Sequence, residues 1–482
     1  MDPDDPALID LGLRRDETGS EARRPLTWRR LRPAALALVT ALLLTTGGSA
    51  LPSAPVLVEI ATVPYSPEPG WTASPGATML LTDDRLVTAV LRPGGSWLIS
   101  AYEPERAELV WTYLLPARND SQMTMRQGAG LVLLSGPRPD GTAGMWTVAL
   151  EAATGRERWS LPHQLWALYG GDIGLTVDPV FDGESATTEN GPAPGADYSY
   201  VSPWGTKYDS GPVEVLAGAV TLGTGEMRWQ SEPVAAVHVD LGDAYPDGAT
   251  VDGGRSDALV VTTSDGAVEV WDPGTGLVRH RFPTPRPDSY LTLDRDLMLI
   301  WEPQGGMTVY STEDYRLRWT RPVAENGSVG FCDGSRLICE SNRVGWWQVV
   351  DPSTGRPSWQ GRQGHQVRGA AGHLIEFVRD DVDSEPTRTV DPRTGQTLID
   401  LTGWDHAVLR SDQPVLLARA DGLLGPTWLG LLAPGATAPT LLGQVPVGLT
   451  DCQIGASLIA CATYPRDLRI WRYRSAFRPG GE

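Results

Sequence analysis

Short apolar segments and polar turns alternate along most of this chain. The stretch 328–360 shows the pattern clearly, because each segment is apolar or alternating and is bounded by Gly, Asp, Asn or Pro. The expected strands there are Val329–Cys332, Arg336–Glu340, Trp346–Val350 and Arg356–Gln360. Asp-Pro-Ser-Thr-Gly separates the last two, and this turn returns the chain antiparallel because Pro presets φ and Gly supplies a positive φ.

The turn recurs as a repeat, with a spacing near forty residues in the later part of the chain. Its usual form is Thr-Gly with Trp four positions after the glycine, and Ala107 and Tyr315 replace the glycine in two copies. Ile399 replaces Trp in the last copy. The glycines and tryptophans of the repeat are Trp111, Gly155, Trp159, Gly225, Trp229, Gly276, Trp319, Gly355, Trp359 and Gly395. We expect each Trp to lie in an outer strand and to pack between neighbouring units.

This period determines the expected architecture. About forty residues correspond to one four-stranded blade of a β-propeller. The sequence therefore predicts an all-β fold, a β-propeller of four-stranded antiparallel blades. Seven repeat copies and a further unit at Trp428–Pro434 favour eight blades, within a range of seven to nine. Leu458–Ala462 and Leu468–Tyr473 look like part of a ninth unit, which Pro55–Val63 could complete by closing the ring.

The amino-terminal segment predicts export from the cytoplasm. Residues 33–50 carry no charge and follow seven arginines between Arg14 and Arg32. An apolar run of this length can form a transmembrane helix, and the arginines mark its cytoplasmic side. We expect a cytoplasmic segment 1–32, a single-pass transmembrane helix or signal anchor 33–55, an extracytoplasmic propeller 56–477 and a tail 478–482. The alternative is a cleaved signal ending at Ala50, which would make the protein secreted.

The four cysteines fall into two close pairs, Cys332 with Cys339 and Cys452 with Cys461. Each pair lies in equivalent places, in the first two strands of an expected blade, where partners across a hairpin come within bonding distance. An oxidising compartment would keep them joined, so we expect two structural disulfide bonds. Zinc binding is the competing interpretation, but no histidine accompanies either pair and the spacings are wider than those of zinc knuckles.

The Asp-x-x-Thr-Gly-x-x-x-Trp copies resemble the repeats of pyrroloquinoline-quinone-type (PQQ-like) propellers, from about Trp71 to Tyr473. That group contains quinoprotein dehydrogenases and non-enzymatic relatives, such as the lipoprotein scaffold of the bacterial outer-membrane assembly machine. The resemblance implies the blade fold and not an activity, because the motif residues form turns and packing contacts rather than a binding or catalytic site. A quinoprotein dehydrogenase would add adjacent cysteines and a calcium site, and this sequence has no Cys-Cys pair. We therefore expect no catalysis, no cofactor and no bound metal, with a quinone-dependent dehydrogenase as the alternative.

Composition restricts the partner without identifying it. The net charge of −19 argues against nucleic acid. Lys207 is the only lysine, and this arginine-dominated composition favours a high-GC bacterium of actinobacterial type.

Two insertions interrupt the repeat and are candidate binding loops; the competing interpretation, which the sequence favours, is a loop that is disordered or only solvated. The first, at about Asp178–Pro212, contains aromatic residues suited to protein contact. These are Tyr198, Tyr200, Trp204 and Tyr208. The second is acidic and runs from His238 to Asp257. We expect a membrane-anchored, non-catalytic binding or scaffold module for an unidentified protein or cell-envelope ligand; a sensor that signals through the single helix is a further alternative.

Overall fold

The computed structural model describes residues 57–64, 78–82, 84–92, 95–116, 123–137, 145–169, 171–180, 200–201, 207–208, 214–240, 259–263, 267–283, 290–294, 296–302, 306–323, 327–332, 337–342, 347–378, 385–409, 413–422, 425–463 and 467–473. The chain divides into a unit of Met1–Ala54 and a unit of Pro55–Glu482, and every described residue belongs to the second. The expected segments 1–32, 33–55 and 478–482 lie outside the described residues. Within the described ranges, no helix has the length and hydropathy needed to span a bilayer.

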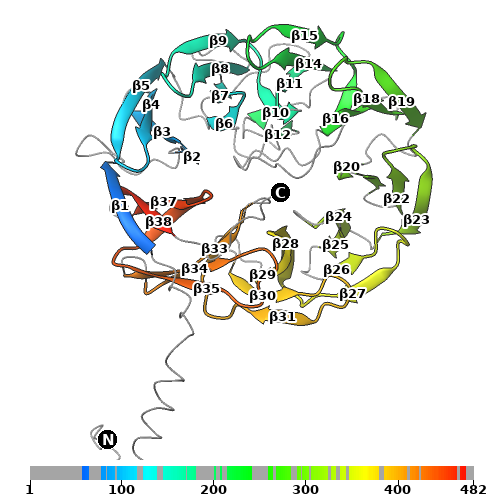
Figure 1. The fold of residues 1–482 in the computed structure, drawn as a ribbon. Coiled ribbons are helices and arrows are strands. Elements are labelled where there is room, and N and C mark those ends of the chain that lie inside the picture. Colours follow the sequence, from blue (N-terminus) through cyan, green and yellow to red (C-terminus); the bar gives the residue numbers. More distant parts are fainter. Residues whose placement is uncertain are drawn as a thin grey trace, which may run out of the picture. The chain divides into compact units, whose positions relative to one another are not determined.

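Nine four-stranded antiparallel sheets follow one another through the described ranges and form the blades of a propeller, with the first strand of each blade innermost (Figure 1). Blade 1 consists of β2 (Thr78–Leu81), β3 (Leu86–Arg92), β4 (Ser96–Glu103) and β5 (Glu108–Pro116). Blade 2 consists of β6 (Thr124–Gly128), β7 (Leu131–Pro137), β8 (Met145–Glu151) and β9 (Glu157–Leu161). Blade 3 consists of β10 (Leu165–Tyr169), β11 (Ile173–Val180), β14 (Glu214–Thr221) and β15 (Met227–Gln230). Blade 4 consists of β16 (Ala236–Asp240), β17 (Leu259–Thr263), β18 (Ala267–Trp271) and β19 (Val278–Pro283). Blade 5 consists of β20 (Tyr290–Asp294), β21 (Leu297–Trp301), β22 (Gly306–Ser311) and β23 (Leu317–Pro322). Blade 6 consists of β24 (Gly327–Phe331), β25 (Ile338–Asn342), β26 (Trp347–Val350) and β27 (Pro357–Gln360).

Blade 7 consists of β28 (His365–Ala370), β29 (His373–Val378), β30 (Pro386–Val390) and β31 (Thr397–Asp400). Blade 8 consists of β32 (His406–Val408), β33 (Val415–Ala420), β34 (Thr427–Leu432) and β35 (Thr440–Val445). Blade 9 consists of β36 (Leu449–Ile454), β37 (Leu458–Thr463), β38 (Asp467–Tyr473) and β1 (Leu57–Pro64). A separate two-stranded sheet pairs β12 (Tyr200–Val201) with β13 (Lys207–Tyr208).

The ninth blade is assembled from both ends of the chain. Strand β1 pairs antiparallel with β38 from Leu57↔Tyr473 to Pro64↔Asp467, so the first described strand forms the outer strand of the last blade (Figure 1). Gln453 then joins this blade to blade 1, because its side chain accepts a hydrogen bond from Leu81 N at 2.8 Å and donates one to Met79 O. The expected count of eight blades is wrong by one, because the partial unit at the carboxyl end is a complete blade.

Apolar side chains fill the space between consecutive blades. Nine clusters of buried residues each join one blade to the next, and together they run around the whole ring of described blades. The cluster between blades 6 and 7, for example, combines Trp347 and Val349 with Val367 and Leu374. Each sheet is therefore stabilised by burial on both faces rather than by one central core.

Five of the nine junctions share one contact between a tryptophan and the turn of the following blade. Trp319 in β23 donates its indole N–H to Pro352 O at 2.8 Å, and a Cβ added to Gly355 would lie 2.6 Å from the indole ring. Glycine at this position also has φ +69°, which disfavours side chains. The same indole-to-carbonyl bond joins Trp111 to Ala152, Trp159 to Leu222, Trp229 to Pro273 and Trp359 to Pro392. The corresponding turn glycines are Gly155, Gly225, Gly276 and Gly395.

The junction between blades 4 and 5 replaces both partners of this contact. His280 occupies the tryptophan position of β19, and Tyr315 occupies the glycine position of the next turn with φ 54°. The two rings stack with centroids 4.7 Å apart and an interplanar angle of 12°. Since even a Cβ at the glycine position would meet a tryptophan, a tyrosine there requires the smaller histidine ring.

We predict strong coupling between these two positions. His280→Trp alone should destabilise by roughly 1–3 kcal/mol, because the indole would overlap Tyr315. The double variant His280→Trp, Tyr315→Gly should recover stability, with a coupling energy of about 1–3 kcal/mol in a urea-denaturation cycle. Additive effects of the two substitutions would contradict this pairing.

The glycine turns allow a second test that separates backbone strain from close contact. Gly355 and Gly372 both have positive φ, but nothing lies within 4 Å of a Cβ built on Gly372. Gly372→Ala should cost about 1–2 kcal/mol for the left-handed backbone alone. Gly355→Ala should cost roughly 1–3 kcal/mol more, because Trp319 must move. Equal denaturation midpoints for the two variants would show that the indole contact has no energetic weight.

Candidate functional site

The longest loop between described strands leaves blade 3. Residues 181–213 connect β11 to β14, whereas the corresponding loops of the other eight blades have three to seven residues, as in 264–266 and 138–144. The sequence-based boundary at Asp178 is wrong, because β11 pairs with β14 as far as Val180↔Glu214. The loop therefore departs from a hairpin that is paired up to the loop itself.

Two of the four candidate aromatic residues lie in the small sheet within this loop. The backbone of β12 and β13 pairs Tyr200 with Tyr208 and Val201 with Lys207. Tyr198 and Trp204 lie outside the described residues, as do the side chains of Tyr200 and Tyr208. The aromatic contact surface stays a prediction.

The second insertion leaves the neighbouring blade on the opposite face of the propeller. It corresponds to residues 241–258, which connect the first strand β16 to the second strand β17, while the loop 181–213 connects a second strand to a third. Because antiparallel neighbours reverse direction, these two kinds of loop emerge at opposite ends of the strands. His238 and Asp240, which the sequence placed in this insertion, belong to β16. The two long loops therefore leave the propeller from opposite faces.

Two buried glutamates are the most unusual polar groups among the described residues. Glu340 in β25 is 1% exposed and Glu376 in β29 is 0% exposed. They occupy equivalent positions, since Glu340 pairs with Val329 and Gln348 and Glu376 pairs with Val367 and Arg388 in the first and third strands. Sequence reasoning missed both, although a glutamate within the apolar runs Leu-Ile-Cys-Glu and Leu-Ile-Glu-Phe was the available signal.

The carboxylate of Glu340 is neutralised from the neighbouring blade. Arg321, in the outer strand β23 of blade 5, places its Nη2 2.7 Å from Glu340 Oε2. Gln348 donates its Nε2 hydrogen to the same oxygen at 2.6 Å. Arg321 also reaches Gly355 O at 3.4 Å, so one arginine links a buried charge to the turn on which Trp319 packs. The ion pair of Glu340 and Arg321 therefore links blade 6 to blade 5.

The carboxylate of Glu376 is neutralised within its own blade. Arg388 in β30 donates its Nε hydrogen to Glu376 Oε2, while Oε1 has no hydrogen-bond partner among the described residues. His365 Nδ1 lies 4.0 Å from Glu376 Oε1, which is too far for a direct hydrogen bond. Burial lowers the pKa of His365, so this imidazole is neutral near pH 7. The arrangement is a buried ion pair with a neutral histidine beside it.

An ion pair at the start of blade 3 was also missed by sequence reasoning. His163 Nδ1 lies 2.6 Å from Asp178 Oδ2, and Gln164 N donates to Asp178 Oδ1 at 3.3 Å. Thr147 Oγ1 donates to His163 O at 2.8 Å, which ties the same segment to blade 2. Asp178 therefore fixes the connection between two blades and is not a loop ligand.

Both expected disulfide bonds are confirmed, and both join the first two strands of a blade. In blade 9, Cys452 and Cys461 are directly opposite each other with Cα atoms 4.1 Å apart. In blade 6, Cys332 follows the end of β24, and its Cα lies 5.0 Å from that of Cys339. The two pairs therefore differ in register and are not at equivalent places.

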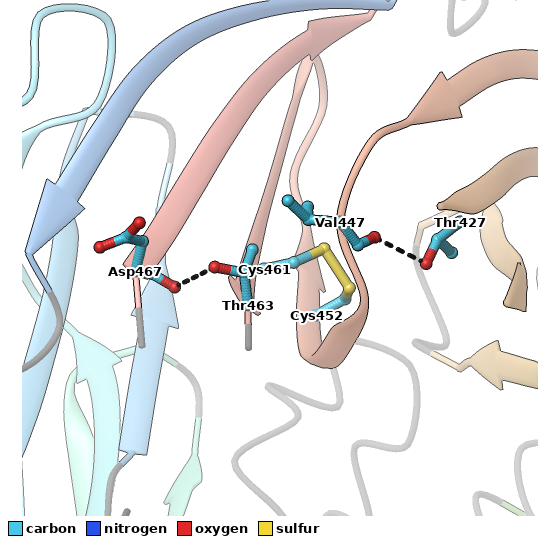
Figure 2. The surroundings of a disulfide bond; sticks show 6 residues. All are labelled: Thr427, Val447, Cys452, Cys461, Thr463 and Asp467. Atoms are coloured by element: carbon cyan, nitrogen blue, oxygen red, sulfur yellow. Dashed lines mark hydrogen bonds between the residues drawn. A yellow bond between two sulfur atoms is a disulfide. The ribbon is translucent and has the colours of Figure 1, made fainter. Parts of the chain in front are cut away.

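Hydrogen bonds surround the blade 9 disulfide (Figure 2). Thr427 Oγ1 of blade 8 donates to Val447 O at 2.9 Å, and Thr463 Oγ1 donates to Asp467 O at 3.0 Å. The first of these bonds holds the connection from blade 8 into blade 9, and the second closes the hairpin of β37 and β38. The disulfide is thus part of the structure that closes the ring.

The described residues do not fit the quinone site of PQQ-dependent dehydrogenases. All four cysteines are used in bonds between strands, so no adjacent cysteine pair is formed. In the described ranges, no group of three His, Cys, Asp or Glu side chains is arranged to hold a metal ion.

Comparisons with known proteins give similarity without a family. No protein-family model matches the chain, and no curated protein matches it. Solved structures that align with it include BamB from Moraxella catarrhalis, at 12% identity over 86% of this chain and 100% of that one, with a TM-score of 0.38. A europium-containing methanol dehydrogenase aligns at 11% identity over 84% of both chains with a TM-score of 0.38. The dihydro-heme d1 dehydrogenase NirN aligns at 14% identity over 81% of this chain and 79% of that one, with a TM-score of 0.40. At such values these alignments do not decide whether this chain is an enzyme.

The His163–Asp178 pair predicts a pH dependence of stability. The hydrogen bond that His163 donates to the Asp178 carboxylate raises the pKa of His163 above the value of about 6.5 expected in an unfolded chain. The stabilisation is therefore fully present below about pH 6 and is lost as the pH rises through the folded-state pKa. His163→Gln should cost roughly 1 kcal/mol at pH 5.5 and less at pH 8.5 in urea denaturation. Asp178→Asn should remove the same pH dependence, and a cost that grows with pH would contradict the assignment.

Proposed function

We propose that this chain is a membrane-tethered, extracytoplasmic propeller that binds a protein or another cell-envelope component through the loop 181–213. The observation that carries the proposal is the length of this loop on a fully paired hairpin. A hairpin such as β11–β14 can be closed by two residues, so the fold itself does not require the additional chain. Long loops on a rigid framework commonly carry binding.

The framework supports a binding role for physical reasons. Every junction between described blades is filled by apolar side chains, and the two buried glutamates are neutralised by Arg321 and Arg388. The hairpin β11–β14 is thereby held in place before any partner arrives, which reduces the ordering entropy lost on binding. The buried charges stabilise the blades, so the loops are the part of the chain that can vary and bind a partner.

The proposed location has independent support in the cysteines. Two disulfide bonds use all four cysteines of the chain, as is typical of proteins in oxidising compartments. The uncharged segment 33–50 and the arginines before it support a tether with the propeller outside.

Replacement of the loop tests this proposal. In the full-length chain, residues 181–213 should be replaced by Asn-Gly, which preserves the pair Val180↔Glu214 with a type I′ turn. We expect unchanged thermal stability and loss of the proteins captured by cross-linking from envelope membranes of the source cells. The matched control replaces 379–385, the loop between β29 and β30 at the equivalent position of blade 7, and should retain capture.

Two results would contradict the proposal. Capture that survives the replacement of 181–213 would exclude this loop as the binding element. Reduction of a dye by the chain after loading with pyrroloquinoline quinone and calcium would favour the dehydrogenase alternative.

A further inference from the structure

The outer strands of the nine blades divide into two sectors of different chemistry. The outer strands of blades 2 to 5, which are β9, β15, β19 and β23, each contain arginine. The outer strands of the other five blades, which are β27, β31, β35, β1 and β5, contain neither arginine nor lysine. These five strands are consecutive around the ring (Figure 1).

The difference is sharpest at one structural position. Each outer strand has a bulge just before the tryptophan position, and the bulged residue in blades 2 to 5 is always arginine, as in Arg228 and Arg318. In blades 7, 8, 9 and 1 the bulged residue is apolar: Leu398, Leu442, Ile60 and Val110. We call β31, β35, β1 and β5 the apolar sector, and β9, β15, β19 and β23 the arginine sector.

Each of the four strands of the apolar sector exposes at least one large apolar side chain, although the bulged Leu442 is buried and the bulged Ile60 is half-buried. The exposed fractions are 59% for Leu398, 51% for Leu441, 48% for Val58, 56% for Leu109, 42% for Val110 and 52% for Leu114. The arginine sector also exposes Leu277, Val278 and Leu317, but these lie within two residues of Arg279 or next to Arg318 in the chain. Edge strands of soluble proteins usually carry charge to prevent association, and the apolar sector lacks this positive charge.

Two acidic groups in or beside the apolar sector are ion-paired, whereas Glu108 in β5 and Asp400 in β31 are exposed. Glu59 in β1 lies 3.3 Å from Arg469, and Glu105 beside β5 lies 2.7 Å from Arg472. Both arginines come from β38, the strand next to β1. Pairing reduces the charge that an apolar environment would have to accommodate.

The chain itself indicates what covers this sector. Everything before position 57 joins the propeller through β1, which lies between β35 and β5 of the neighbouring blades (Figure 1). The proposed transmembrane segment 33–55 ends two residues before Leu57, a distance of at most about 7 Å along the chain. A bilayer crossed by that segment therefore has to lie close to the apolar sector.

From this coincidence we infer that the apolar sector is a lipid-docking surface, which sets the propeller edge-on against the membrane with its arginine sector pointing away. The inference rests on the proposed tether and adds an orientation to it. Exposed leucines and valines of β31, β35, β1 and β5 enter the boundary between headgroups and acyl chains, to a depth of about 5–10 Å for such surface contacts.

Site-specific fluorescence on the full-length chain in vesicles tests the orientation. All four native cysteines are in disulfide bonds, so a single added cysteine can be labelled selectively with an environment-sensitive dye. Val110→Cys and Leu398→Cys report on the apolar sector, and the matched bulge positions Arg158→Cys and Arg228→Cys report on the arginine sector. Vesicles of phosphatidylcholine and phosphatidylglycerol, with or without doxyl-labelled lipid, provide the quencher.

We expect the labels at positions 110 and 398 to shift to the blue and to be quenched several-fold more strongly by doxyl lipid than those at 158 and 228. Equal quenching in vesicles that the chain accompanies on flotation would overturn the docking surface and leave the tether intact. Failure to float would overturn both. Emission that depends on protein concentration and not on doxyl lipid would identify a second copy of the chain as the occupant, which also overturns the inference.

Discussion

The packing of an indole on the glycine turn of the following blade is the contact on which the propeller depends. A glycine with φ near +70° leaves room for the ring, and the turn carbonyl three residues earlier accepts the indole N–H, as between Trp319, Gly355 and Pro352. The contact buries a large apolar area without leaving a polar atom unsatisfied. Because five junctions repeat it, consecutive sheets take up the same relationship and the chain curves into a ring.

The junctions that lack this contact show what else can close the ring. Ile399, Gly443 and Ala61 occupy the tryptophan position in blades 7, 8 and 9, which are consecutive and include the blade built from both chain ends. In blade 9 the outer strand β1 comes from the start of the propeller, so no turn connects β38 to β1. A tryptophan in the outer strand of blade 8 would therefore have no turn to pack on. Side-chain hydrogen bonds of Gln453 link blade 9 to blade 1, and that of Thr427 links blade 8 to the connection into blade 9. The disulfide Cys452–Cys461 joins two strands within blade 9.

The sequence specified what depends on local chemistry and spacing. Thr-Gly followed by Trp identified the blade, and paired cysteines on adjacent strands identified both disulfides. The favoured count of eight blades was wrong, although the sequence offered Pro55–Val63 as the strand that could complete a ninth unit, because a blade formed from distant segments shows only part of its repeat at each end of the chain. The stacking of His280 on Tyr315 was not predicted, because the two residues belong to different blades and meet only in the folded ring. Asp178 looked like the start of the first insertion, and only its position beside His163 shows a structural role.

Electrostatics alone does not determine how this propeller meets a membrane. The net charge of −19 opposes approach to an anionic surface, and attraction through the arginines of blades 2 to 5 would favour the opposite edge. In the proposed orientation, contact through the apolar sector would come from burial of its leucines and valines and from the proposed tether that precedes β1. With that edge at the bilayer, the two faces of the propeller point along the membrane plane. The loops 181–213 and 241–258 would then be offered to different neighbours in the envelope.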